Sequence, residues 1–228
     1  MNALADRVWP EVPEQGAQVL VPVGSTEQHG PHLPLDTDTV IAQAVCRRVA
    51  ERLDDPRVLI APAIAFGSSG EHQGFPGTVS IGTETLKLVM VELVRSLRIW
   101  AGRVVLVNGH GGNVAALEQA VQQLQLEGHD VAWLPCATED VDLHAGFTET
   151  SLLLHLCPDR VRMDAAAAGD TQPLAALLPS LVKHGVRAVS ENGVLGDPAG
   201  ASAEEGGRVL EAMARSIADR IQVTAEVS

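Results

Sequence analysis

Apolar positions follow two patterns along the chain. Short runs rich in valine, bounded by glycine or polar residues, are typical of strands buried on both faces. These runs are Gln18–Val23, Val58–Ile64, Arg103–Asn108 and Asp130–Pro135. Longer stretches repeat an apolar side chain every three or four residues, which predicts helices with one apolar face. These stretches are Thr39–Leu53, Thr83–Trp100, Val114–Glu127 and Glu204–Val223.

The predicted strands and helices alternate, and this order indicates an α/β fold with a mostly parallel sheet and helices on both sides. No internal repeat or linker divides the 228 residues, so we expect a single domain over residues 1–228. The alanine-rich stretch Ala165–Leu178 predicts a loop or a short helix. Ligands of such folds bind where parallel strands end, so motifs at strand ends carry the functional prediction.

Composition excludes several classes of protein. The net charge is -13, whereas nucleic-acid binding needs clustered lysine and arginine. No apolar run reaches the ~18 residues that span a bilayer, and the N-terminus lacks the apolar segment of a signal peptide. We therefore expect a cytoplasmic protein that binds neither nucleic acid nor membrane. Cys46, Cys136 and Cys157 form no CxxC pair, which argues against a disulfide framework or a zinc ribbon.

The first polar motif, GSTEQHGPHLPLDTD, follows the first predicted strand. Glu27 and His29 are two residues apart, so in extended backbone their side chains point to the same side. A carboxylate and an imidazole suit zinc, iron or manganese better than calcium. The chain then turns back at Gly30, which brings either Asp36 or Asp38 towards the same place. The alternative is a polar loop in which Asp38 caps the following helix.

The second motif, NGHGGN, joins the third predicted strand to a helix. His110 lies at the strand end and fits a ligand in a site shared with the first motif. The alternative is a phosphate cradle at the helix N-terminus, in a non-catalytic protein that binds phosphoryl ligands. The motif lacks the GxGxxG spacing and the Walker lysine that such cradles use.

Two further motifs complete the set of candidate residues. Glu149 lies in the first turn of a predicted helix, where a carboxylate either interacts with the helix dipole or ligates a metal. His144, just before it, is then free for proton transfer. The glycine-rich segment from Gly67 to Thr78 predicts a loop over the site, in which His72 contacts substrate or caps a turn. A GxSxG nucleophile motif is absent from the sequence, which disfavours a serine hydrolase.

The runs GSTEQHGPHLPLDTD, GSSGEHQGFPGTVS, NGHGGN and HAGFTETS resemble the creatininase (creatinine amidohydrolase) family, and the likeness extends from about residue 18 to about residue 210. The resemblance implies a three-layer α/β/α fold, two divalent metal ions and a homo-oligomer, a hexamer or an octamer. Iron and zinc are the expected metals, with manganese and magnesium as alternatives. His144 matches the catalytic histidine, and Asp38 rather than Asp36 matches the bridging carboxylate. The implied metal ligands are Glu27, His29, Asp38, His110 and Glu149.

One position departs from creatininase, which carries a glutamate two residues after the histidine of NGH; this chain has Gly112. The implied ligand role then passes to Glu149. SGEHQGFPGTVSIGTE and DVAWLPC resemble family members that remove a C-terminal Val-Tyr dipeptide from a modified precursor peptide during maturation of a redox cofactor. Activity on a small cyclic amide, such as creatinine, or on a formamide is the alternative. His72, Gly111 and Gly112 are the expected substrate contacts.

Overall fold

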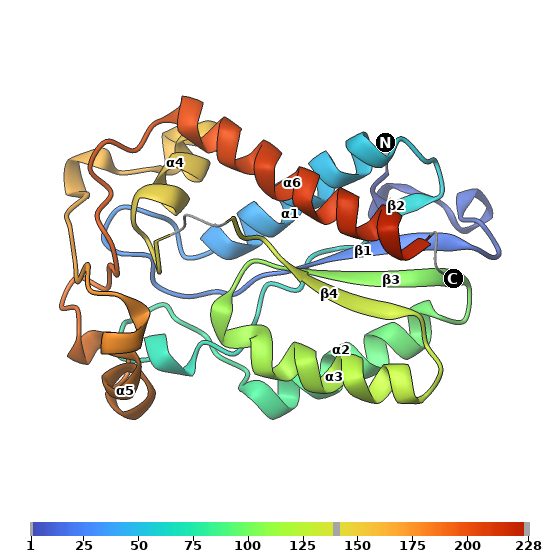
Figure 1. The fold of residues 1–228 in the computed structure, drawn as a ribbon, viewed down its shortest axis with the longest axis horizontal. Coiled ribbons are helices and arrows are strands. Elements are labelled where there is room, and N and C mark those ends of the chain that lie inside the picture. The colour runs from blue at the N-terminus through green and yellow to red at the C-terminus, as the bar shows by residue number, and fades with distance from the viewer. Residues whose placement is uncertain (1, 139–141, 226–228) are drawn as a thin grey trace.

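The computed structural model describes residues 2–138 and 142–225. Its sheet has four strands, all parallel, in the order β2-β1-β3-β4 (Figure 1). The strands are β1 (Ala17–Val23), β2 (Val58–Ile60), β3 (Ala101–Asn108) and β4 (Val131–Pro135). The predicted parallel sheet is therefore confirmed.

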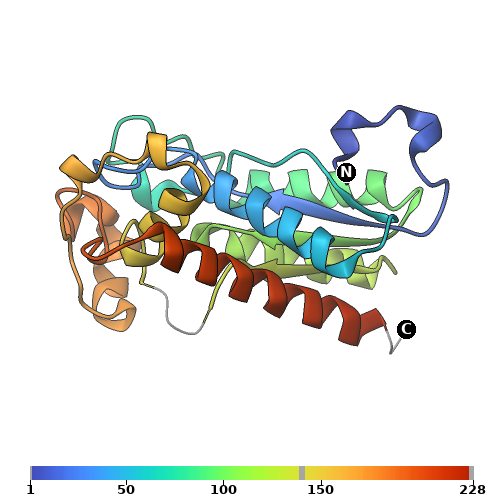
Figure 2. The same cartoon turned by 90° about the horizontal axis from the view of Figure 1, so that it is seen from above.

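Helices cover both faces of the sheet, so the fold has three layers (Figures 1 and 2). On one face lie α1 (Thr37–Leu53), α4 (Phe147–Leu156) and α6 (Ala203–Ala225). On the other lie α2 (Thr83–Leu97) and α3 (Val114–Leu126). Among the described helices, none combines the length and the apolar character needed to cross a membrane.

The continuous apolar character of β1 follows from its central place in the sheet. Leu20 belongs to the core beneath α1 and α6, whereas its neighbours Val19 and Val21 belong to the core beneath α2 and α3. Side chains alternate between the two faces of a strand, so a strand covered on both sides needs apolar residues at every position. Burying each such side chain stabilises the fold by about 1.5–3 kcal/mol.

Two differences from the predicted boundaries bear on the site. The strand predicted over Val58–Ile64 ends at Ile60, and the chain rejoins β1 only through a single bridge between Ile64 and Val23. The N–H of Ala61 still donates to the Leu20 carbonyl, but the next donor to β1 is Ile64, three residues further on instead of two, so the register against β1 slips there. Helix α1 begins two residues before the predicted start, so Asp38 lies inside its first turn and does not cap it.

The alanine-rich stretch is mostly irregular, and a helix begins only near its end, at Leu174. This helix, α5 (Leu174–His184), lies at the left of Figure 1, at the same end of the molecule as α4. It is anchored by a small cluster of buried residues, Leu177, Val186 and Leu195. The register places Val23, Asn108 and Pro135 side by side, so the loops that follow β1, β3 and β4 leave the sheet at one edge.

Candidate metal centre

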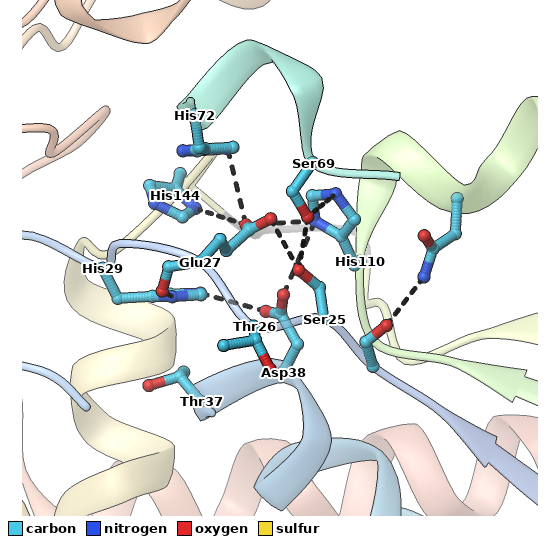
Figure 3. A network of polar contacts seen from close by, with 12 residues as sticks. Ser25, Thr26, Glu27, His29, Thr37, Asp38, Ser69, His72, His110 and His144 are labelled. Carbon is cyan, nitrogen blue, oxygen red and sulfur yellow. Dashed lines mark hydrogen bonds and ion pairs between the residues drawn. The ribbon is translucent and has the colours of Figure 1, made fainter. Parts of the chain in front are cut away.

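The first motif folds back on itself directly after β1. The backbone N–H of Glu27 donates to the carbonyl oxygen of Leu35 at 2.9 Å, which returns the chain to the site at the start of α1. Asp38 then faces inward, with its Oδ1 atom 3.0 Å from Nε2 of His29 (Figure 3). Asp36 faces outward instead and pairs with Arg160 at 2.6 Å.

His110 joins this pair of residues from the end of β3. Its Nδ1 atom lies 3.1 Å from Oε1 of Glu27 and 3.5 Å from Oδ2 of Asp38 (Figure 3). Its Nε2 atom donates to the carbonyl oxygen of Ser68 at 3.1 Å, which turns Nδ1 towards the carboxylates. A side chain at Gly109 would place its Cβ 2.6 Å from the carbonyl oxygen of Asp38, so the glycine permits the close approach of α1 to this turn.

Asn113 ties the surrounding loops together, although the motif gave it no predicted role. Its amide nitrogen donates to the carbonyl oxygen of Gly24 at 3.0 Å, and its amide oxygen accepts from the N–H of Ser68 at 2.8 Å. The loops after β1, β2 and β3 are thereby held in one arrangement around the buried side chains.

Glu149 lies in the first turn of α4 and completes the cluster. Its Oε2 atom accepts a hydrogen bond from the N–H of Ala145 at 2.6 Å and lies 3.7 Å from Nε2 of His29. The described residues offer three overlapping groups whose ligand atoms lie within 4.8 Å of one another. These groups are Glu27–Asp38–His110, His29–His144–Glu149 and Glu27–His72–His144.

Two buried carboxylate oxygens in this cluster, Oε1 of Glu27 and Oδ2 of Asp38, form no hydrogen bond with any described residue. A buried, unsatisfied charged oxygen is costly unless a cation compensates it. Carboxylate and imidazole ligands together are those that zinc, iron and manganese accept. The donor set therefore fits divalent metal ions.

The electrostatics of the protein without metal point the same way. Burial alone would lower the pKa of His29, but Asp38 and Glu149 beside it raise that pKa to about 10. Burial likewise opposes charge on His110, yet Glu27 and Asp38 raise its pKa to about 10. Burial raises the pKa of Glu149 to about 7. The carboxylates thus attract protons to the site when no other cation neutralises them.

His144 is oriented by Gln28, whose role the sequence did not reveal. A carbonyl oxygen only accepts, so the 2.8 Å contact between Nε2 of His144 and the Gln28 carbonyl places a hydrogen on Nε2. The two amide hydrogens of the Gln28 side chain have acceptors in Nδ1 of His72 at 2.9 Å and the Gly193 carbonyl at 3.0 Å. Burial, with His29 and His72 nearby, holds the pKa of His144 well below its usual value. Its Nδ1 atom, 3.8 Å from Oε1 of Glu27, therefore faces the centre as a neutral acceptor.

His72 is buried within the cluster, although its segment predicts a loop that only covers the site. Its Nε2 atom is 3.4 Å from Oε1 of Glu27, and its ring centroid is 4.4 Å from that of His144 (Figure 3). Burial lowers the pKa of His72 to about 4, so the ring is neutral. The structure thus brings together all five predicted ligands with both His72 and His144.

The two glycines predicted to contact substrate differ in their surroundings. A Cβ at Gly111 would meet nothing within 4 Å, whereas one at Gly112 would lie 2.3 Å from the Ser68 carbonyl oxygen and 2.5 Å from Oε1 of Glu71. Glu71, a residue of the glycine-rich loop with no predicted role, also approaches Nε2 of His110 at 3.5 Å. The space next to position 112 is thus filled by another acidic side chain.

Two cavities border the cluster. One of about 720 Å³ is lined by His72, His110 and His144 on one side and by α5 on the other. The second, of about 240 Å³, is lined by Asp38 and Glu149 and by residues near the end of β4. None of the three tryptophans, all within the described ranges, lines either cavity.

Comparisons with known proteins agree with this fold and cluster. The family model for creatininase, creatinine amidohydrolase, matches residues 5–221. The mycofactocin precursor peptide peptidase of Mycolicibacterium smegmatis is 57% identical over 207 residues, which cover 90% of this chain and 84% of that protein. Creatinine amidohydrolase of Pseudomonas putida is 31% identical, with 90% and 88% of the two chains covered.

Solved structures of creatininase have the same fold. A manganese form superposes with a TM-score of 0.80 at 30% identity and covers 98% of both chains. A zinc–zinc form superposes with a TM-score of 0.80 at 29% identity and covers 97% of both. The fold and site thus define an α/β hydrolase that acts on amide bonds. The chain belongs to the creatininase family.

Proposed function

We propose that the chain is a dinuclear metal-dependent peptidase that acts on the mycofactocin precursor peptide and releases its C-terminal Val-Tyr dipeptide during biosynthesis of the redox cofactor. The observation that carries this proposal is the buried cluster around Glu27 and Asp38, in which two carboxylate oxygens form no hydrogen bond with a described residue. It occurs in a chain 57% identical to a peptidase of that name. A cavity of about 720 Å³ beside the cluster supports a peptide over a small cyclic amide.

The proposed ligands divide into two sets that share Asp38. Glu27, Asp38 and His110 would hold one ion, and His29, Asp38 and Glu149 would hold the other. When bound, the ions supply Lewis acidity, which activates water and polarises a carbonyl group. Zinc and iron remain the expected metals, with manganese and magnesium as alternatives; zinc and manganese forms of creatininase support two of these choices.

His144 moves the proton in the proposed reaction. Its Nδ1 atom is a neutral acceptor directed at the centre, because Nε2 is occupied by the Gln28 carbonyl. Nδ1 takes a proton from the attacking water and then gives it to the leaving amine, a role that contributes about 10²–10⁴-fold to the rate. Gly111 and Gly112 border the same cavity, and their N–H groups are proposed to stabilise the developing oxyanion.

We also propose that the chain assembles into a homo-oligomer, a hexamer or an octamer, as the family resemblance implies. Light scattering on the purified protein measures the mass directly. A monomer at micromolar concentration would contradict the assignment.

The test of function is to incubate metal-loaded protein with the decarboxylated precursor peptide and to follow the products by mass spectrometry. We expect Val-Tyr and a peptide shortened by two residues, and we expect EDTA to stop the reaction. Creatinine and a formamide are assayed in parallel. An intact precursor peptide beside turnover of either small amide would move the assignment to a sister activity.

A further inference from the structure

Helix α5 carries a row of exposed apolar residues beside the centre. Leu174, Leu178 and Val182 are 46%, 48% and 80% exposed. They are four residues apart and therefore share one helix face. Exposed apolar side chains that lie together often mark an interaction site, whereas single exposed apolar residues are common on protein surfaces.

This apolar row borders the candidate metal centre. Leu174, Leu178 and Val182 line the same cavity of about 720 Å³ as His72 and His144. The volume lies within the range of about 300–1,000 Å³ that is usual for ligand pockets. An occupant of the cavity therefore contacts both the apolar row and the residues that perform the chemistry.

The lining of the cavity also includes a lysine that pairs with none of the described residues. Lys183 lines it next to Val182 and is one of only two lysines in a chain with a net charge of -13. No hydrogen bond or ion pair joins Lys183 to a residue in the described ranges. Glu71 is the single carboxylate among the described residues of this lining, and it lies beside His110.

The smaller cavity has the opposite character. Asp38, Asp142 and Glu149 line it, and no lysine or arginine is among its described lining residues. Two of these carboxylates, Asp38 and Glu149, are the proposed metal ligands, so the smaller cavity borders the ions and offers no basic side chain of its own. A terminal carboxylate of a peptide is instead attracted beside Lys183, in the cavity lined by α5.

We propose that α5 forms the subsite for the C-terminal end of the peptide substrate, with Leu174, Leu178 and Val182 against its apolar side chains and Lys183 paired with its terminal carboxylate. This inference rests on the proposed peptidase function. It places the leaving segment next to His144, which is the residue that protonates the leaving amine. The remainder of the peptide then extends away from α5.

Steady-state kinetics on two forms of the precursor peptide, the free acid and the C-terminal amide, test the pairing. We expect Lys183→Ala to raise KM for the acid by about three- to tenfold. This factor corresponds to the loss of an ion pair that is exposed in the free protein and partly buried when the peptide binds. KM for the amide should change by less than about twofold, and kcat should stay unchanged for both forms of the peptide. Lys87→Ala, which changes the other lysine, is the matched control.

Leu178→Asp tests the apolar row, and we expect KM to rise by about tenfold or more, since the contact with an apolar side chain is lost. Leu126→Asp is its control, because Leu126 is 85% exposed on α3 and lines neither cavity. Size-exclusion chromatography accompanies both variants. A changed oligomer with an unchanged KM would make the row a subunit contact and overturn the inference.

Two outcomes separate this inference from the proposed function. If the metal-loaded wild type cleaves the peptide but Lys183→Ala affects acid and amide equally, α5 does not read the carboxylate, and the inference alone fails. If the wild type leaves the peptide intact, the proposed function fails and the inference with it.

Discussion

Gly112→Ala is a small substitution with a large expected effect. The added Cβ would lie 2.3 Å from the Ser68 carbonyl oxygen, 2.5 Å from Oε1 of Glu71 and 2.5 Å from Nε2 of His110. Glu71 is free to move as a side chain, but the Ser68 oxygen belongs to the backbone. Relief of the overlap must therefore shift the loop after β2 or the ring of His110.

Overpacking of this kind costs about 1–3 kcal/mol. In a chain of 228 residues, each kcal/mol lowers Tm by about 2–4 °C, so we expect a decrease of about 2–12 °C. Because His110 approaches both Glu27 and Asp38, the same shift should weaken metal binding. A displaced ligand or supporting group typically costs about 10–100-fold in metal affinity.

Gly111→Ala is the matched control, since a Cβ at the neighbouring position meets nothing within 4 Å. Calorimetry on the metal-free proteins gives Tm, and titration with zinc gives the affinity. Gly111→Ala should resemble the wild type in both measurements. If Gly112→Ala were as stable as Gly111→Ala and bound zinc equally well, the packing described around position 112 would be wrong.

Four further predictions concern the metal and the proton. Glu27→Gln should lose bound metal and hydrolysis together, whereas Asp36→Asn, at a partly exposed position paired with Arg160, should keep both; metal analysis of each variant checks this. His144→Ala should keep its metal and lose about 10²–10⁴-fold in kcat, so metal loss would argue against its role in proton transfer. Near neutral pH, apparent zinc affinity should rise by about tenfold per pH unit for each proton displaced, because the facing carboxylates raise the pKa of His29 to about 10; a flat calorimetric profile would contradict this. Zinc at 100 times its Kd should add about 2.7 kcal/mol of stability, seen as a higher urea midpoint, and an unchanged midpoint would show that zinc does not bind the folded protein in preference to the unfolded chain.

The strands were predictable because burial on both faces leaves a continuous apolar run, as in β1. Helix α5 could not be predicted in this way, because Leu177 is its one buried residue. Its apolar row at Leu174, Leu178 and Val182 lies on the cavity side instead. A periodic pattern does not distinguish a face turned to a core from one turned to a cavity. The interruption after Ile60 comes from a one-residue slip in register against β1, which leaves the apolar run itself unchanged and so gives no signal in the sequence.

The candidate site was predictable where its residues are close in sequence. The two-residue spacing of Glu27 and His29 after a strand was sufficient for those positions. The choice of Asp38 over Asp36 needed the family resemblance, because it depends on where α1 begins. The packing of Glu71 against position 112 joins segments 41 residues apart (112 − 71), which no local spacing reveals.

The contacts of Gln28 were beyond prediction for the same reason. This side chain reaches His72, His144 and the Gly193 carbonyl, which lie in three distant segments. Its position between Glu27 and His29 indicated only that it points to the opposite side of the strand end. What it meets there depends on the tertiary fold.

The central claim is that the buried carboxylates and histidines after β1, β3 and at the start of α4 hold two divalent ions. Anomalous X-ray diffraction from crystals of the zinc-loaded protein tests it most directly. We expect two peaks on either side of Asp38, one near Glu27 and His110 and the other near His29 and Glu149. Zinc peaks elsewhere, or a map without peaks at this cluster, would contradict the account.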